Sequence, residues 1–410
     1  MPKVHILILV FGVLSVGILT EIVLRWINPV RLWRDAFDEA YPMESHDVRG
    51  WTSKKNFSFD FHHRYLRKRV KINLNSIGAH DRSPPEIVKT KEALRVAFLG
   101  GTTAAGWELE RNQTVGAMLR ENLSRKYSDR KVELIDASTR LYSTRQLYHH
   151  YCEEVRKYRP DIVIYYFNLN HPRRVITGHE SGKSINLSQP IFAIGPDGQL
   201  VLRKTDPPTN KNDLIYLDET GEICRIPGTT TRTLWGAATE WSHLATLIDD
   251  LIQGPVRLRK FQDRREIKDI ELWKDLPERV THLGQLPFQW RVIEKVLGLW
   301  AKTVSEHSGK FFVASTLAYY CTREGGLFSF EPKHPWGFSF DKIPERKYLE
   351  FIAGMHEFSY LDTYSEARNR GFPGDGFYVH PRYCYFNQKG ADFAAAGIAN
   401  LLPTIDQLKT

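Results

Sequence analysis

The sequence predicts an α/β protein with a three-layer architecture: a parallel sheet covered by helices on both faces, with one N-terminal transmembrane helix and a mixed α/β insertion. Three observations predict it. Short strands in which nearly every residue is apolar alternate with segments of helical spacing, which is typical of a buried parallel sheet. The chain opens on a long apolar run. A long, more polar stretch separates the third apolar strand from the fourth.

The composition is that of an ordinary globular protein. The 410 residues include 42% hydrophobic and 26% charged residues, values that exclude a disordered chain, a collagen and a multi-pass membrane protein. A net charge of +9 is mild for this length, so it fits an acidic partner or an anionic membrane surface and does not predict nucleic-acid binding. The four cysteines lack CxxC and CxxH spacing, so we expect no metal and no other cofactor.

The N-terminal run predicts a membrane anchor over residues 4–24. Val4–Thr20 contains no Asp, Glu, Lys or Arg, and the apolar run continues past Glu21 to Leu24. As a helix this segment spans about 31 Å at 1.5 Å per residue, close to the hydrocarbon thickness of a bilayer. The absence of a small-residue cleavage motif favours an uncleaved anchor over a signal peptide. Basic residues after the span favour the opposite orientation, but large domains are exported against such a bias, so we expect an exported domain.

Residues 25–93 are interpreted as a juxtamembrane connector that contains a β-hairpin. Phe57–Phe61 and Val70–Leu74 alternate apolar and polar residues, which predicts two half-buried strands. The residues between and beside them are basic, namely Arg64, Arg67, Lys68 and Arg69. This cluster fits a solvated hairpin end, and alternatively a contact with lipid headgroups or an acidic partner.

The first half of the α/β domain is predicted over residues 94–171. Strands are expected at Val96–Leu99, Val132–Ile135 and Ile162–Phe167, with helices over Asn112–Tyr127 and about Thr144–Tyr158. The order strand, helix, strand, helix, strand, with apolar strands, predicts a parallel sheet with right-handed crossovers.

Residues 172–309 are interpreted as an insertion at the carboxyl edge of the sheet, and residues 310–410 as the second half of the domain. The insertion is expected to hold hairpins at 191–202 and 214–226 and helices near 234–252 and 288–306. The second half is expected to hold strands at Lys310–Ser315 and Phe358–Leu361 and a closing helix after Phe386.

Over roughly residues 70–171 and 310–410, the chain resembles the SGNH (GDSL-like) hydrolase family in its membrane-anchored bacterial form. Phe98–Gly106 resembles the nucleophile turn of that family, Ile135–Thr144 its second segment and Arg159–Asn170 its third; Asn75–Gly78 with Asp81-Arg82 resembles the lead-in. The resemblance implies an SGNH/flavodoxin-like sheet. For an active member it implies carboxylic-ester hydrolysis or O-acetyl transfer.

Several positions of the family's active site hold other residues in this chain. The resemblance places Thr102 at the nucleophile, Leu141 at the second-segment glycine, Asn170 at the oxyanion asparagine and His171 at the following aspartate. A threonine hydroxyl can attack an ester, although its β-methyl crowds the turn, and the alternative is that it caps a helix. Leu141 keeps an N–H, but its Cβ disfavours the backbone angles of glycine. Asn170 fits an oxyanion donor and a loop-capping amide about equally.

Two registers are open for the family's DxxH pattern, which supplies the acid and the base. With Gly390 as the anchor, the histidine position holds Tyr385 and the acid position Arg382. With His380 as general base, the nearest acid is Asp375 and the following loop is longer. The pattern is broken in either register.

Two cysteines fall at the carboxyl edge of the predicted sheet. Cys321 follows the strand at 310–315, and Cys384 lies in the loop before the last helix. In an oxidising compartment these two could form a disulfide.

The combined loss of the serine, the glycine and the Asp–His pair predicts a non-catalytic domain. We expect a structural or binding subunit of a membrane protein complex or cell envelope, held to the lipid bilayer through residues 4–24, on the periplasmic side of a bacterial inner membrane. Its expected partners are other membrane subunits, and a glycan is compatible. The alternative is an O-acyl esterase or acyltransferase that acts on acetylated envelope glycans through Thr102.

Overall fold

The computed structural model describes most of the α/β domain and part of the insertion. The described residues are 2–27, 42–63, 68–168, 171–175, 179–182, 185–188, 190–195, 197–203, 214–217, 222–226, 244, 281–316, 344–371, 378–380 and 383–409.

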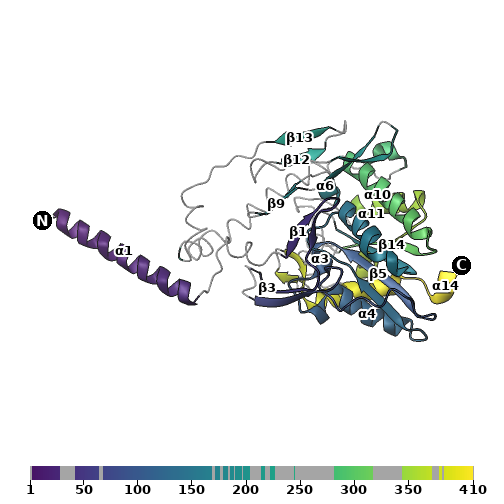
Figure 1. Cartoon of the computed structure of the whole chain (residues 1–410), viewed down its shortest axis with the longest axis horizontal. Coiled ribbons are helices and arrows are strands. Elements are labelled where there is room, and N and C mark those ends of the chain that lie inside the picture. Colours follow the sequence, from purple (N-terminus) through teal and green to yellow (C-terminus); the bar gives the residue numbers. More distant parts are fainter. Residues whose placement is uncertain are drawn as a thin grey trace.

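A five-stranded parallel sheet forms the centre of the domain (Figure 1). Its strands are β5 (Leu94–Gly100), β6 (Val132–Asp136), β7 (Ile162–Phe167), β14 (Lys310–Ser315) and β15 (Ser359–Leu361). They lie in the order β15-β14-β7-β5-β6, and every neighbouring pair is parallel. Counted along the chain this is the order 2-1-3-4-5 of flavodoxin-like folds. The predicted parallel sheet is therefore confirmed.

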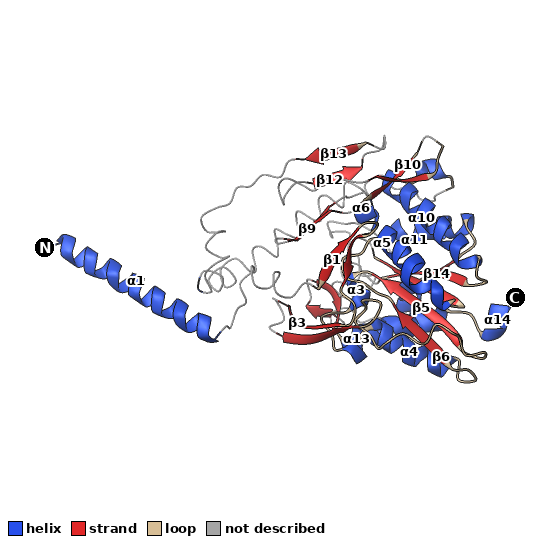
Figure 2. Ribbon diagram, in the orientation of Figure 1, coloured by secondary structure: helices blue, strands red, loops and turns tan. Residues whose placement is uncertain are grey.

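Helices cover both faces of the sheet, because successive strand residues point to opposite sides and both sets are apolar (Figure 2). One face packs on α5 (Thr144–His150), α10 (Phe288–Ser305) and α11 (Pro344–Met355). The other face packs on α4 (Val115–Lys126), α12 (Thr363–Asn369) and α13 (Gln388–Leu401). Phe98 and Leu99, adjacent in β5, belong to different faces and are both fully buried.

The helix predicted over Thr144–Tyr158 changes its hydrogen bonding part of the way along. It begins as α5, passes into a π-helical turn (Tyr151–Val155) and ends in a 3₁₀ turn (Arg156–Tyr158). Ser143 and Gln146 form a capping box at its start, where the Ser143 N–H donates to Gln146 Oε1 over 2.9 Å.

Two antiparallel hairpins precede the sheet. The first joins β1 (Met43–His46) to β2 (Gly50–Ser53), and the second joins β3 (Phe57–His63) to β4 (Lys68–Leu74). The second confirms the predicted connector hairpin, and its apolar side chains pack with Trp107. Of the predicted basic cluster, Arg64 and Arg67 lie outside the described residues.

Described parts of the insertion form three further hairpins. They are β8 (His179–Gly182) with β9 (Ile185–Ser188), β10 (Ile191–Ile194) with β11 (Leu200–Arg203), and β12 (Leu214–Leu217) with β13 (Ile223–Ile226). The last two agree with the predicted hairpins. Of the helix expected near 234–252, only residue 244 is described. The helix expected near 288–306 is α10, which covers the sheet with Trp290 and Trp300 and is part of the core.

Short elements complete the described structure. They are α3 (Thr102–Ala105), 3₁₀ turns at Arg111–Gln113 and Leu283–Gln285, α6 (His171–Val175), the hairpin of β16 (Tyr378–His380) with β17 (Tyr383–Phe386), and α14 (Ile405–Lys409). The closing helix predicted after Phe386 is α13, and the Asn387 side chain caps it by accepting the Gly390 N–H over 3.0 Å.

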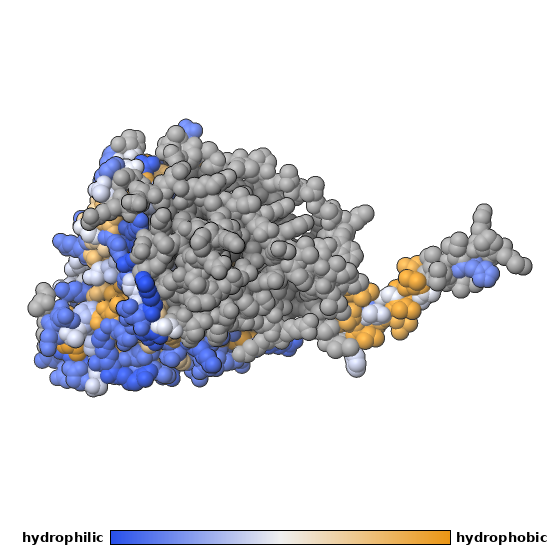
Figure 3. Space-filling model, turned by 180° about the vertical axis from the view of Figure 1, so that it is seen from behind, coloured by the Kyte–Doolittle hydropathy of each residue, from blue (hydrophilic) through white to orange (hydrophobic). Residues whose placement is uncertain are grey.

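The structure does not bear out the predicted membrane span of residues 4–24. A helix, α1 (Pro2–Ile27), forms over this stretch, and its described large apolar side chains are exposed except Leu24, which is half-buried (Figure 3). Among the residues whose side chains are described, which in α1 are His5 and residues 11–26, no helix is both long and apolar enough to cross a membrane.

Candidate functional site

The site predicted by the sequence begins at the turn that follows β5. Gly101 is extended, and α3 starts at Thr102, with the Ala105 N–H donating to the Gly101 carbonyl over 2.9 Å. A Cβ at Gly100 would overlap the Ala104 side chain, so only glycine allows α3 to turn back this closely on the strand. The turn brings Thr102 to the carboxyl edge of the sheet and leaves it partly exposed.

Leu141 faces this turn with its backbone N–H. The loop after β6 is tied to β5, because the N–H groups of Ala137 and Thr139 donate to the carbonyls of Phe98 and Gly100. The Leu141 N–H donates to Thr102 Oγ1 over 3.0 Å. The Leu141 N–H, predicted as an oxyanion donor, is thus bonded to the Thr102 hydroxyl itself.

The backbone of Leu141 is left-handed, with a φ of 66°. An L-residue in this conformation brings Cβ close to the following carbonyl and costs roughly 1–2 kcal/mol relative to glycine. At this position the backbone therefore has a conformation that glycine adopts easily and leucine disfavours. Such a strained residue persists only where its surroundings hold it in place.

A histidine and an asparagine at the end of β7 support the same turn. Asn168 Nδ2 donates to Thr103 Oγ1 over 3.2 Å. The His171 ring is buried, with Nδ1 2.5 Å from Tyr165 Oη and accepting the Asn168 N–H over 3.3 Å. A Cβ on Gly101 would lie 2.9 Å from His171 Nε2, so the glycine makes room for the imidazole.

These contacts assign the polar roles differently from the sequence prediction. Asn170, predicted as the oxyanion amide, lies outside the described residues. Asn168, two residues earlier in the same third segment, contacts the turn instead, although the sequence predicts no role for it. His171 could have been found from its place after the third strand, where the family carries an aspartate. Its described contacts run into the core, since Tyr165 Oη in turn lies 2.8 Å from Thr144 Oγ1.

The predicted acid and base are not brought to Thr102 by any described contact. Asp375 lies outside the described residues, and His380 is described only as the end of β16, paired with Tyr383 of β17. Strand β17, which carries Tyr385, lies beside α3. Within the described part of the chain, no histidine or carboxylate is bonded to the Thr102 hydroxyl.

The predicted disulfide and the predicted absence of a metal are not tested. Cys321 lies outside the described residues, and Cys384 is described only as part of β17. Cys152, in the π-helical turn, is a free thiol. The described residues contain no group of three or more histidine, cysteine, aspartate or glutamate side chains that could hold a metal ion.

A buried pair of carboxyl groups lies under the Leu141 loop. Asp136 ends β6, and its Oδ1 accepts the Ser138 N–H over 2.9 Å. Burial, together with the charge of Asp81, raises the pKa of Asp136 to about 7. Asp81 is itself buried and paired with Arg120 on α4. The charge of Asp81, in the lead-in segment, thus acts on a carboxyl group at the end of β6.

Comparisons with known proteins give likenesses to solved hydrolase structures. No protein-family model and no curated protein sequence matches the chain. A lipase/acylhydrolase from Enterococcus faecalis is 11% identical, with 75% of this chain and 93% of that chain covered and a TM-score of 0.35. A catalytic mutant of an acetylxylan esterase from Geobacillus stearothermophilus is 10% identical, with 77% and 95% covered and a TM-score of 0.36.

An α/β hydrolase from the metagenome of Lake Arreo is 10% identical, with 77% of this chain and 97% of that chain covered and a TM-score of 0.38. At TM-scores below 0.5, these likenesses carry no argument about the site.

Proposed function

We propose that this chain is a non-catalytic SGNH-like domain that serves as a structural or binding subunit. One observation carries the proposal: the described partner of the Thr102 hydroxyl is the Leu141 N–H, and no described base or acid is bonded to it. A hydroxyl becomes an effective nucleophile only when an adjacent base takes its proton. A turn without such a base would keep its shape and would not catalyse ester hydrolysis.

The packing around the turn supports the same reading. The imidazole of His171, which is described beside the turn, directs Nδ1 to Tyr165 and Asn168 in the interior. Its burial among these partners gives it the role of holding the turn against β7. Its Nε2 lies against Gly101, so the imidazole fills the space between the turn and β7.

Hydrolysis of an aryl acetate by the full chain in mild detergent tests the proposal. The wild type, Thr102→Ala and Thr102→Ser are expected to give the same rate as buffer containing detergent alone, because among the described residues no acid or base is bonded to the hydroxyl at position 102. Turnover by the wild type that disappears in Thr102→Ala would contradict the proposal. Turnover gained only by Thr102→Ser would show that a base is present and that the β-methyl alone blocks the site, which also contradicts it.

We further propose that the domain is anchored through residues 4–24 and lies on the exported side of a bacterial membrane, with other membrane subunits as partners. The uncharged run Val4–Thr20 of the sequence supports this proposal. The chain is expected to stay with membranes during alkaline-carbonate extraction and to be degraded by protease added outside spheroplasts. Release by carbonate would contradict the anchor, and protection of the domain would contradict the orientation. A stoichiometric membrane protein that co-purifies in mild detergent would identify a partner.

A second function has one observation in its favour. The Leu141 N–H is kept at 3.0 Å from Thr102 Oγ1 in spite of the backbone strain, as an esterase or O-acyltransferase would require. Release of acetate from an acetylated polysaccharide by the wild type, and not by Thr102→Ala, would establish this activity. The same result would overturn the non-catalytic assignment.

A further inference from the structure

Both residues next to Leu141 are held by segments outside the parallel sheet. Tyr142 follows it and is fully buried. Its hydroxyl donates to the Trp51 carbonyl of β2 over 2.9 Å and accepts a hydrogen bond from Arg49 over 3.3 Å. The first hairpin therefore fixes the residue that immediately follows the left-handed Leu141.

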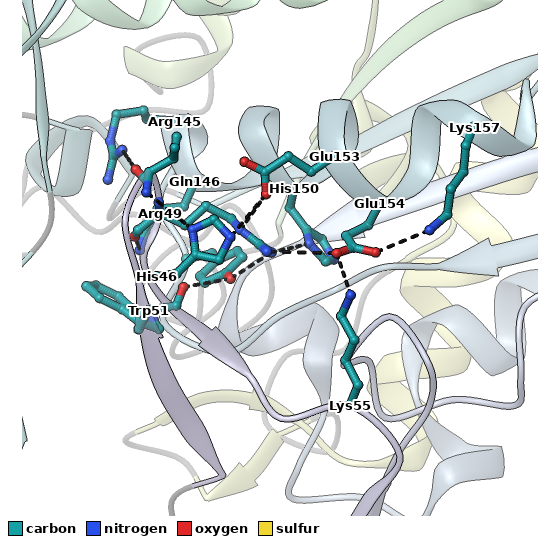
Figure 4. A network of polar contacts seen from close by, with 12 residues as sticks. His46, Arg49, Trp51, Lys55, Arg145, Gln146, His150, Glu153, Glu154 and Lys157 are labelled. Atoms are coloured by element: carbon teal, nitrogen blue, oxygen red, sulfur yellow. Dashed lines mark hydrogen bonds and ion pairs between the residues drawn. The ribbon is translucent and has the colours of Figure 1, made fainter.

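Arg49 is in turn held by α5 and the π-helical turn (Figure 4). One Nη atom lies 2.7 Å from His150 Nδ1, and Nε lies 3.1 Å from Glu153 Oε2. Gln146 Nε2 donates to the Arg49 carbonyl over 2.8 Å. The guanidinium is almost completely buried. Breaking its contacts would therefore leave further buried polar groups without a hydrogen-bond partner, which is costly.

The β1–β2 hairpin is attached at two more points. An Arg145 Nη atom donates to the Val48 carbonyl over 2.9 Å, and Lys55 Nζ lies 2.6 Å from Glu154 Oε1 (Figure 4). These contacts join residues about a hundred positions apart in the chain. The hairpin is thus held against α5 and the π-helical turn, close to the loop that follows β6 and carries Leu141.

Arg140, which precedes Leu141, is held in a comparable way. It forms an ion pair of 2.8 Å with the buried Glu108. Its guanidinium stacks 4.8 Å from the ring centre of Phe61 in β3 and 5.3 Å from that of Trp107. The second hairpin and the turn after α3 therefore fix the other flank of Leu141.

We propose that these two hairpins, together with the turn after α3, act as a clamp that holds Leu141 in its left-handed conformation, with Tyr142 and Arg140 as positioning residues that direct the Leu141 N–H at Thr102. The clamp consists of Arg49 and Trp51 on the Tyr142 side and of Phe61 and Glu108 on the Arg140 side. A glycine at this position needs no clamp, whereas a leucine does. The inference rests on the proposed site at Thr102 and Leu141, but it does not depend on whether that site turns over a substrate.

Hydrogen–deuterium exchange of the Leu141 amide in the full chain, in mild detergent, tests the clamp. Tyr142→Phe removes only the hydroxyl and is expected to speed exchange at residue 141 about tenfold, equivalent to about 1.4 kcal/mol. Tyr127→Phe is the matched control, because its hydroxyl donates to the Pro403 carbonyl over 2.6 Å far from this loop, and it is expected to leave residue 141 unchanged. Thr102→Ala gives the rate of the amide without its acceptor.

The decisive comparison places the same change in a Leu141→Gly background. There Tyr142→Phe is expected to speed exchange by less than about twofold once intrinsic rates are corrected, since glycine adopts the left-handed conformation unaided. Equal acceleration in both backgrounds, or no acceleration by Tyr142→Phe, would overturn the clamp. Glu108→Gln tests the other flank if Tyr142→Phe is poorly folded: a faster exchange at residue 141 is expected, and an unchanged rate would contradict the role of Arg140. Because exchange is measured and not hydrolysis, the clamp can fail while the proposed lack of turnover stands.

Discussion

Replacing Asp136 by asparagine is expected to remove a specific part of the pH dependence of folding. Asp136 is buried at the end of β6, where burial and the neighbouring Asp81 carboxylate raise its pKa from 3.8 to about 7. Ser138 and Arg120 act in the opposite direction without cancelling the shift. The folded protein therefore holds a proton on this carboxyl group in a range where the unfolded chain has released it.

The size and sign of the effect follow from this shift. A pKa raised from 3.8 to about 7 corresponds to at most about 4 kcal/mol, at about 1.4 kcal/mol per unit. The proton is bound by the folded state, so this stability is complete below the unfolded pKa and is lost as the pH rises through the folded pKa. As the pH rises from about 4 to 7, the free energy of unfolding of the wild type is therefore expected to fall by about 1.4 kcal/mol per pH unit relative to that of Asp136→Asn. Above about pH 7 the difference between the two proteins is expected to stay constant.

Denaturant unfolding of the full chain in mild detergent, at intervals from pH 4.5 to 8, measures the difference. Asp129→Asn is the matched control, because Asp129 is exposed and the same substitution there removes a carboxyl group without touching the interior. A difference between the wild type and Asp136→Asn that does not change with pH would refute the reasoning. It would mean that Asp136 is ionised in the folded protein.

Two further changes address the same region and the clamp. Gly116→Ala would place a Cβ on α4 against the Asp136 carboxyl group. It is expected to lower the free energy of unfolding by about 1–3 kcal/mol, measured as a lower denaturation midpoint with an unchanged slope. A midpoint equal to that of the wild type would show that the Asp136 side chain can move away without loss of stability. Burial, with the nearby Arg49 charge, lowers the pKa of His150 from 6.5 to about 3, so its contribution is complete above the unfolded pKa and is lost as the pH falls toward 3. His150→Gln keeps an acceptor for Arg49. Between pH 6.5 and 4.5 this variant is expected to lose less stability than the wild type. An equally steep loss in the variant would contradict a neutral imidazole at His150.

The sheet could be predicted because its signal is local. Every residue of Ile162–Phe167 is apolar and buried, and the same holds for Val96–Leu99, so periodicity alone indicates strands covered on both faces. The family resemblance added the order of the segments. The amphipathic spacing of α10 predicts a helix, but it does not show that this helix covers the sheet, because the spacing is the same for a helix that covers an insertion.

The site could be predicted only in part, because long-range contacts decide its geometry. No local rule predicts a left-handed Leu141, since the preference of the residue opposes it and the contacts of Tyr142 and Arg140 maintain it. The β1–β2 hairpin has no strong strand pattern, and it is stabilised by its contacts with α5. The π-helical turn was missed because one extra residue in a helical turn leaves the apolar spacing almost unchanged.

The main proposal is that the turn that carries Thr102 does not catalyse ester hydrolysis. It is tested most directly by incubating the full chain with an aryl acetate, quenching in acid and measuring the mass of the intact protein and of the peptide that contains Thr102. The account predicts that Thr102 carries no acetyl group at any time of quenching. An acetyl group on Thr102 that accumulates and then disappears during hydrolysis, and is absent from Thr102→Ala, would contradict it.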